Sequence, residues 1–70
     1  MTIAYRITNN SGFLRIEWCS QAYSEDELNE AIWLCNRELR AGLPRREQLQ
    51  ARREIAQFEE LLAALRSAGA

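Results

Sequence analysis

The sequence predicts a small α+β domain of the order ββαα, in which an antiparallel β-hairpin packs on an antiparallel helical hairpin. Two observations predict this fold class. Apolar and polar side chains alternate through the first part of the chain, as in half-buried strands. Two stripes of apolar residues at helical spacing follow, with a single proline between them. A chain of 70 residues has room for one small core, so residues 1–70 are expected to form a single domain.

The β-hairpin is expected over residues 2–19, because apolar and polar side chains alternate on both sides of an Asn-Asn-Ser-Gly turn. Pairing Thr8 with Phe13 places apolar side chains opposite one another along one face of the hairpin. The same register sets Arg6 opposite Arg15 on the outer face. Two like charges there cost some stability unless an acid lies nearby.

The first helix is expected over residues 24–41. Ser24 and Glu27 have the spacing of a capping box, and the acids of this turn meet the positive end of the helix dipole. Gly42 suits a left-handed cap at the other end. Because a two-stranded sheet is marginally stable alone, this helix is expected to cover the apolar face of the hairpin.

The second helix is expected over residues 44–67. Pro44 fits the first turn of a helix, and apolar residues then recur at alternating steps of four and three. This apolar stripe is expected to pack within the molecule, although two heptads of the same pattern could serve as a short coiled coil. Residues 68–70 are small and polar enough to fray.

The composition argues against catalysis and against a metal site. The chain has no histidine, which removes the usual general base near neutral pH and the commonest metal ligand. Cys19 and Cys35 have no base to activate them, and two cysteines alone cannot complete a zinc site. The sequence therefore predicts a protein that is not an enzyme, with no cofactor, no metal and two reduced thiols.

The charge pattern favours a binding protein. The chain has no apolar run long enough to cross a membrane and no signal-peptide pattern, so a cytoplasmic protein without membrane contact is expected. Residues 21–34 carry four acids and no base, and helix capping explains most of them. Residues 35–53 carry six arginines and only two glutamates. This basic block has no comparable explanation.

Four arginines of the second helix are the first candidate binding residues. Arg45 and Arg52 are seven residues apart, as are Arg46 and Arg53, so all four lie on one side of the helix. None has an acid three or four residues away, and Arg45 and Arg46 oppose the helix dipole. Two structural alternatives remain: a solvated helix face, or pairing with the acids of the first helix.

Two aromatic residues are candidate anchors for a partner. Trp33 has only polar neighbours on its helix, and aromatic side chains dominate binding hot spots. Phe13 lies on the outer face of the hairpin together with Arg6 and Arg15, where no remaining part of the chain is expected to cover it. We expect the arginines to make electrostatic contacts with the partner, and Trp33 or Phe13 to supply the apolar anchor. The structural alternative is that Trp33 faces one flank of a wide core.

Taken whole, the chain resembles the small bacteriophage proteins that shut down or redirect host machinery. The resemblance covers nearly the whole chain, including the opening strand TIAYRIT and the hairpin segment NNSGFLRIEW. Within this family it is most similar to the transcription regulators of Xanthomonas phages that bind host RNA polymerase. The resemblance implies binding near the N-terminus of the β′ subunit and next to ω, a block of promoter-dependent initiation through loss of σ, and antitermination.

Other function classes remain open at this point. The chain could inhibit another host complex, such as a CRISPR effector, by covering its binding site. It could also bind nucleic acid through the arginine-rich helix, although glutamates interleave with these arginines and no known binding motif occurs. The exposed strand edges could accept a strand from a second copy, so a monomer or a weak dimer is expected.

Overall fold

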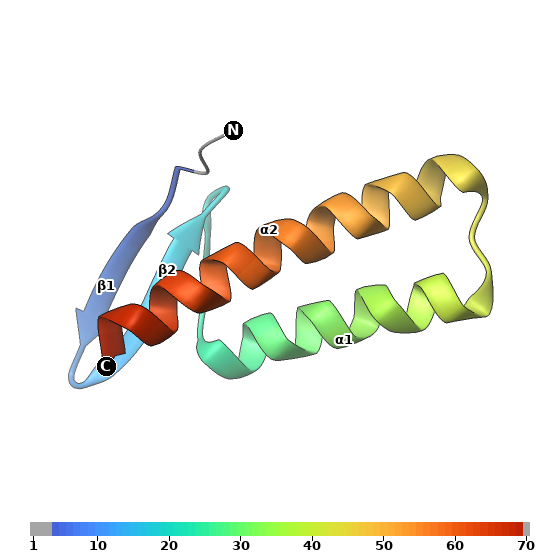
Figure 1. The fold of residues 1–70 in the computed structure, drawn as a ribbon. Coiled ribbons are helices and arrows are strands. Elements are labelled where there is room, and N and C mark those ends of the chain that lie inside the picture. The colour runs from blue at the N-terminus through green and yellow to red at the C-terminus, as the bar shows by residue number, and fades with distance from the viewer. Residues whose placement is uncertain (1–3, 70) are drawn as a thin grey trace.

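The protein has an α+β fold in which a three-stranded antiparallel sheet is followed by two helices (Figure 1). The computed structural model describes residues 4–69. The elements, in chain order, are β1 (Arg6–Asn10), β2 (Phe13–Trp18), β3 (Gln21–Tyr23), α1 (Glu25–Ala41) and α2 (Arg45–Gly69). The predicted class is confirmed, but the sheet has one strand more than expected.

The turn between β1 and β2 is tighter than expected. Ser11 and Gly12 both have positive φ, 57° and 88°, so two residues close the hairpin as in a type I′ turn. Asn10 therefore pairs with Phe13. The predicted pairing of Thr8 with Phe13 is wrong by two residues, because it assigned four residues to the turn. A shift of two leaves each side chain on its expected face.

The corrected register also changes the charge pairs on the outer face of the sheet. Arg6 lies opposite Glu17, and the Arg6 Nε atom is 3.9 Å from the Glu17 Oε2 atom. Arg15 lies opposite Thr8. The like-charge pair expected between Arg6 and Arg15 is therefore wrong. Residues 2 and 3 of the expected first strand lie outside the described residues.

The third strand follows a second tight turn. Cys19 and Ser20 have φ values of 53° and 65°, and Trp18 pairs with Gln21 across them. The chain thus reverses at Cys19, where the hairpin was expected to end, and adds β3 to the free edge of β2. β1 and β3 are the two edges of the resulting sheet.

Both helices begin where the sequence predicts, within a residue. The Glu27 amide donates to the Ser24 Oγ atom (3.2 Å), and the Ser24 amide donates to the Glu27 Oε1 atom (3.1 Å), which completes the capping box of α1. Gly42 caps α1 with a φ of 91°. Helix α2 continues to Gly69, two residues beyond its expected end at residue 67.

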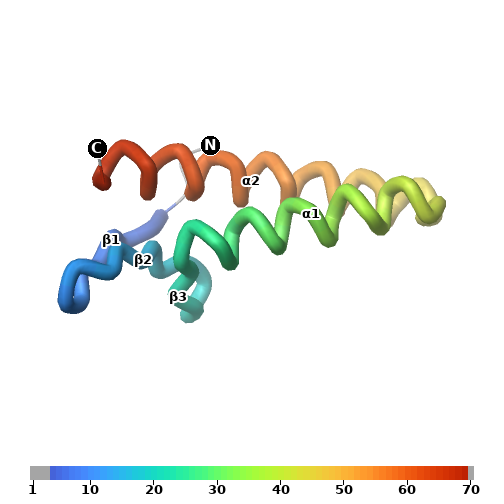
Figure 2. The backbone as a smooth tube through the Cα atoms, turned by 90° about the horizontal axis from the view of Figure 1, so that it is seen from below, coloured from blue at the N-terminus to red at the C-terminus, as the bar shows by residue number. Residues whose placement is uncertain are grey.

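The core lies between β2, the start of α1 and the C-terminal half of α2 (Figure 2). Its buried side chains are Ile16, Leu28, Leu61, Leu62 and Leu65. Phe58 of α2 packs edge-on against Trp18 and Tyr23, with ring centroids 5.9 Å apart in both pairs. Most of the side chains over the sheet therefore come from α2. The expectation that the first helix would provide the cover is met only in part, because α1 contributes the buried Leu28 and the partly buried Ile32.

The far halves of the two helices extend beyond the sheet. The molecule measures 42 × 23 × 21 Å, and the helical hairpin accounts for its long axis (Figures 1 and 2). In this projecting part, Ala51 and Cys35 are the buried side chains among the described residues. Most other side chains there are exposed, so this end of the molecule offers surface rather than core.

Candidate partner-binding surface

The four candidate arginines of α2 form an exposed, uncompensated basic surface. Arg45, Arg46, Arg52 and Arg53 are all exposed. Among residues 4–69, the ion pairs are Arg6–Glu17 and Arg66–Glu25, so none of the four has an acidic partner within 4 Å.

The antiparallel helical hairpin explains why the acids of α1 do not neutralise this surface. Glu25, at the start of α1, lies beside the end of α2, where its Oε1 atom is 2.9 Å from the Arg66 Nε atom. The arginine-rich start of α2 instead lies beside the end of α1, which carries Arg37 and Arg40. Pairing between the acidic and basic blocks, the structural alternative considered from the sequence, is therefore wrong.

An exposed leucine lies at the centre of the four arginines. Leu49 is 59% exposed. It follows Arg45 and Arg46 by four and three residues and precedes Arg52 and Arg53 by three and four, which are the spacings of neighbours on a helix surface. We call these five residues the Leu49–arginine surface. Leu49 is not among the site residues predicted from the sequence, although its spacing to the four arginines is a signal that could have identified it.

Trp33 lies on the solvent side of α1. Its side chain is 59% exposed, and the Arg37 guanidinium carbon lies 5.6 Å from the centroid of its ring. Trp33, Asn36, Arg37 and Arg40 line a shallow hollow of about 210 Å³. The alternative in which Trp33 faces a flank of the core is wrong. The cation over its ring belongs to its own helix.

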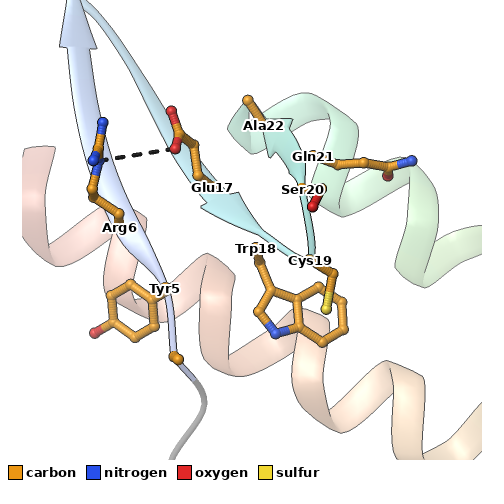
Figure 3. Close-up of a pocket in the computed structure, with 9 residues that line it drawn as sticks. Tyr5, Arg6, Glu17, Trp18, Cys19, Ser20, Gln21 and Ala22 are labelled. Carbon is orange, nitrogen blue, oxygen red and sulfur yellow. Dashed lines mark ion pairs between the residues drawn. The ribbon is translucent and has the colours of Figure 1, made fainter.

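The outer face of the sheet carries the remaining candidates. Phe13 is 75% exposed beside the β1–β2 turn, and Arg6 and Arg15 are also exposed on this face. At the other end of the strands, a hollow of about 580 Å³ is lined by residues of all three strands (Figure 3). The Arg6–Glu17 pair lies along this hollow, so Arg6 already has a partner within the molecule.

The eight candidate residues therefore fall into three separate places. Arg45, Arg46, Arg52 and Arg53 lie together on α2, Trp33 lies on α1, and Arg6, Phe13 and Arg15 lie on the sheet. The β1–β2 turn is at the opposite end of the molecule from the loop that joins the helices (Figure 1). Of the three places, the α2 cluster has the most cations without an acidic partner within 4 Å, four around one exposed apolar side chain, whereas Trp33 has Arg37 and Arg40 beside it.

The two thiols are free and differ in environment. Cys19 is exposed in the β2–β3 turn, whereas Cys35 is buried between the helices with its Sγ atom 3.8 Å from the Glu54 Oε2 atom. Burial, followed by the nearby Glu54 carboxylate, raises the pKa of Cys35 above its ordinary value of 9.0 and keeps this thiol protonated near neutral pH. Within residues 4–69, no three acidic or cysteine side chains gather in a way that could hold a metal ion.

Comparison of the chain with protein-family models, with curated proteins and with solved structures finds no match. In the described part of the chain, no helix is long and apolar enough to cross a lipid bilayer. The molecule is a small α+β protein whose candidate binding residues lie in three surface patches.

Proposed function

We propose that this chain is a small non-enzymatic regulator of the bacteriophage type, which binds host RNA polymerase in the cytoplasm and inhibits or redirects transcription. The resemblance of residues 2–18 to phage transcription regulators supplies the target. The observation that carries the binding role is the Leu49–arginine surface. Four guanidinium groups without intramolecular partners surround an exposed apolar side chain there.

Physical chemistry supports a protein partner at this surface. Arginine is enriched at hot spots because its planar group makes paired hydrogen bonds to carboxylates. An apolar side chain surrounded by such groups loses its water on contact, which strengthens the charged contacts around it. In the free molecule, Leu49 stays hydrated and the arginines repel one another. Both costs are relieved when an acidic partner covers the surface.

The proposed mechanism is occlusion, since a protein of this size has no room for a large active-site cleft. On the polymerase, the chain binds the N-terminal region of β′ next to ω, which loosens σ and blocks promoter-dependent initiation. Antitermination follows if the chain stays bound during elongation. In these steps, the bound molecule blocks access to the polymerase surface over its length of 42 Å.

The test is binding to purified bacterial RNA polymerase core and σ-containing holoenzyme, measured by biolayer interferometry after nuclease treatment. We expect binding to both and displacement of σ in a parallel gel-filtration run. The Arg52→Ala/Arg53→Ala variant should weaken binding about tenfold or more. An Arg66→Ala variant serves as the matched control at the other end of α2, where the arginine is paired with Glu25. No binding to either form of polymerase would reject the proposed target.

Nucleic acid is the second candidate partner, because four unpaired guanidinium groups also suit phosphates. Salt titration separates the two. Binding to a duplex through these arginines predicts a slope of log affinity against log salt of about −0.9 for each phosphate contacted. The nuclease-treated binding measurement gives the complementary result, because binding that depends on nucleic acid disappears from it.

A further inference from the structure

We propose that the Leu49–arginine surface recognises an acidic amphipathic segment, in which carboxylates surround a single apolar side chain. This inference rests on the proposed function, because it specifies the chemistry of the partner at the same site. It commits to a protein segment as the occupant. Charge complementarity and the position of Leu49 within the arginines are the two observations behind it.

The first argument is geometric. Residues 45 and 53 are eight apart, so the surface extends about 12 Å along α2 at 1.5 Å per residue. A partner helix of about two turns covers that length. Carboxylates three and four residues on either side of an apolar residue on that helix repeat the spacing of the arginines around Leu49. A helix with that pattern would match the spacing of the Leu49–arginine surface.

The second argument is electrostatic. Arg45 and Arg46 lie in the first turn of α2, where the helix dipole disfavours cations. Their neighbours three and four residues later on α2 are Gln48, Leu49 and Gln50, none of which carries an acid. The surface therefore carries a charge cost in the free protein. Carboxylates of an acidic partner remove that cost, so the free molecule is already arranged for them.

The third argument separates a protein segment from nucleic acid. A phosphate backbone satisfies the arginines, but it gives Leu49 no apolar surface to cover. A leucine that is 59% exposed at the centre of a basic surface is better matched by an apolar side chain on the partner. The other two places offer fewer free cations, because Arg6 is paired with Glu17 in the strand-lined hollow and the Trp33 patch has two arginines, Arg37 and Arg40, of which Arg37 lies over the Trp33 ring.

A designed peptide tests the chemistry without the polymerase. The probe is a capped helical 15-residue peptide with one leucine and glutamates three and four residues to either side of it. Two matched peptides replace the glutamates by glutamine or the leucine by asparagine. We expect the probe to shift the amide NMR signals of residues 45–53. Each matched peptide should bind at least about tenfold more weakly than the probe. Shifts confined to α1 or to the sheet would overturn the inference.

Variants of the protein provide the second readout. Leu49→Ala should weaken binding of the probe and of polymerase about tenfold, whereas Leu34→Ala, which removes an exposed leucine of α1, should change both less than twofold. Circular dichroism of each variant checks that the fold is retained. A 20-base-pair duplex is then added as a competitor of the probe. If the duplex displaces the probe from the wild-type protein and from Leu49→Ala at the same concentration, the inference is overturned.

The two proposals fail in different ways. If the probe binds at residues 45–53 and polymerase does not bind, the inference on partner chemistry holds and the polymerase is the wrong target. If polymerase binds with an affinity that Leu49→Ala and Arg52→Ala leave unchanged, the target is right and the inference is wrong. The same set of variants therefore decides both.

Discussion

Glu27 shows how one exposed carboxylate links pH to the stability of a helix end. It accepts a hydrogen bond from the Ser24 amide, which is an N–H that the first turn of α1 leaves without a helical partner. Hydrogen bonds with the Ser24 backbone and then its side chain lower the pKa of Glu27 below its ordinary value of 4.5. The charged form is therefore more favoured in the folded protein than in the unfolded chain.

This pKa difference predicts loss of stability in acid. A group with a lowered folded-state pKa stabilises the fold above its unfolded pKa, here about 4.5, and loses that contribution as the pH falls through the lower folded value. We expect the melting temperature to fall between about pH 5 and pH 3. Glu27→Gln should flatten this dependence in thermal melts followed by circular dichroism. Glu60→Gln, on the exposed face of α2, is the control, and an equal flattening there would contradict the prediction.

At single positions, the sequence predicts best where a short pattern has a local cause. Ser24 and Glu27 lie three residues apart, and the capping box follows from that spacing alone. The turn at Cys19 and Ser20 could not be predicted in this way, because both residues carry a Cβ atom and rarely adopt positive φ. Leu49 was missed for another reason. A prediction based on the charges of the arginines does not include Leu49, because Leu49 is the uncharged residue between them.

Among the elements, α2 holds the sheet through one aromatic side chain. Phe58 contacts the rings of Trp18 from β2 and Tyr23 from β3, both edge to face at 5.9 Å. Aromatic pairs of this geometry contribute about 0.5–1.5 kcal/mol beyond the burial of their area. Burial, followed by the nearby Cys19 and Glu27, raises the pKa of Tyr23 above its ordinary value of 10.0. Phe58 therefore fixes the position of α2 relative to two strands at once.

We expect Phe58→Ala to lower the free energy of unfolding by about 2–4 kcal/mol, because it leaves a gap under two rings in a small core. Urea denaturation followed by circular dichroism measures it. The matched control is Phe13→Ala, which removes an aromatic ring that is 75% exposed and should change stability by about 0.5 kcal/mol or less. Equal losses in the two variants would mean that Phe58 does not hold the sheet as described.

The sequence also predicts the helices better than their arrangement. Caps and apolar spacing lie within each helix, so α1 and α2 could be located from local patterns. Which helix covers the sheet depends on how a long hairpin rests on three strands. The core residues Leu61, Leu62 and Leu65 cluster near the end of α2, where the apolar stripe is most continuous. That clustering is the signal in the sequence for α2 as the covering helix.

At the scale of the whole molecule, the antiparallel topology keeps the acids at the start of α1 away from the arginines at the start of α2. Glu25 pairs with Arg66 near the end of α2, and the arginines at the start of α2 lie near the end of α1, which carries Arg37, Glu38 and Arg40. The net charge of residues 35–53 predicted a basic block. It could not predict that this block lies away from the acids at the start of α1, because that depends on which helix ends lie side by side. The candidate surface is thus a property of the assembled fold.

A surface kept for a partner should cost the free protein some stability. We expect Arg45→Gln/Arg46→Gln to raise the free energy of unfolding by about 0.3–1 kcal/mol per residue at low salt, because it removes cations from the positive end of the α2 dipole. Urea denaturation at about 20 mM and 500 mM salt measures this, and screening should shrink the gain at the higher salt. The same variant should bind polymerase and the acidic probe at least about tenfold more weakly than the wild-type protein does.

The control is Arg66→Gln, which should lower the free energy of unfolding instead of raising it. Arg66 lies in the last turn of α2, where the dipole favours a cation, and its Nε atom is bonded to the Glu25 carboxylate at 2.9 Å. Its loss should destabilise the fold slightly and leave partner binding unchanged. If Arg45→Gln/Arg46→Gln instead destabilised the protein as Arg66→Gln does, these two arginines would stabilise the fold. The proposal that the start of α2 binds an acidic partner would then lose its electrostatic support.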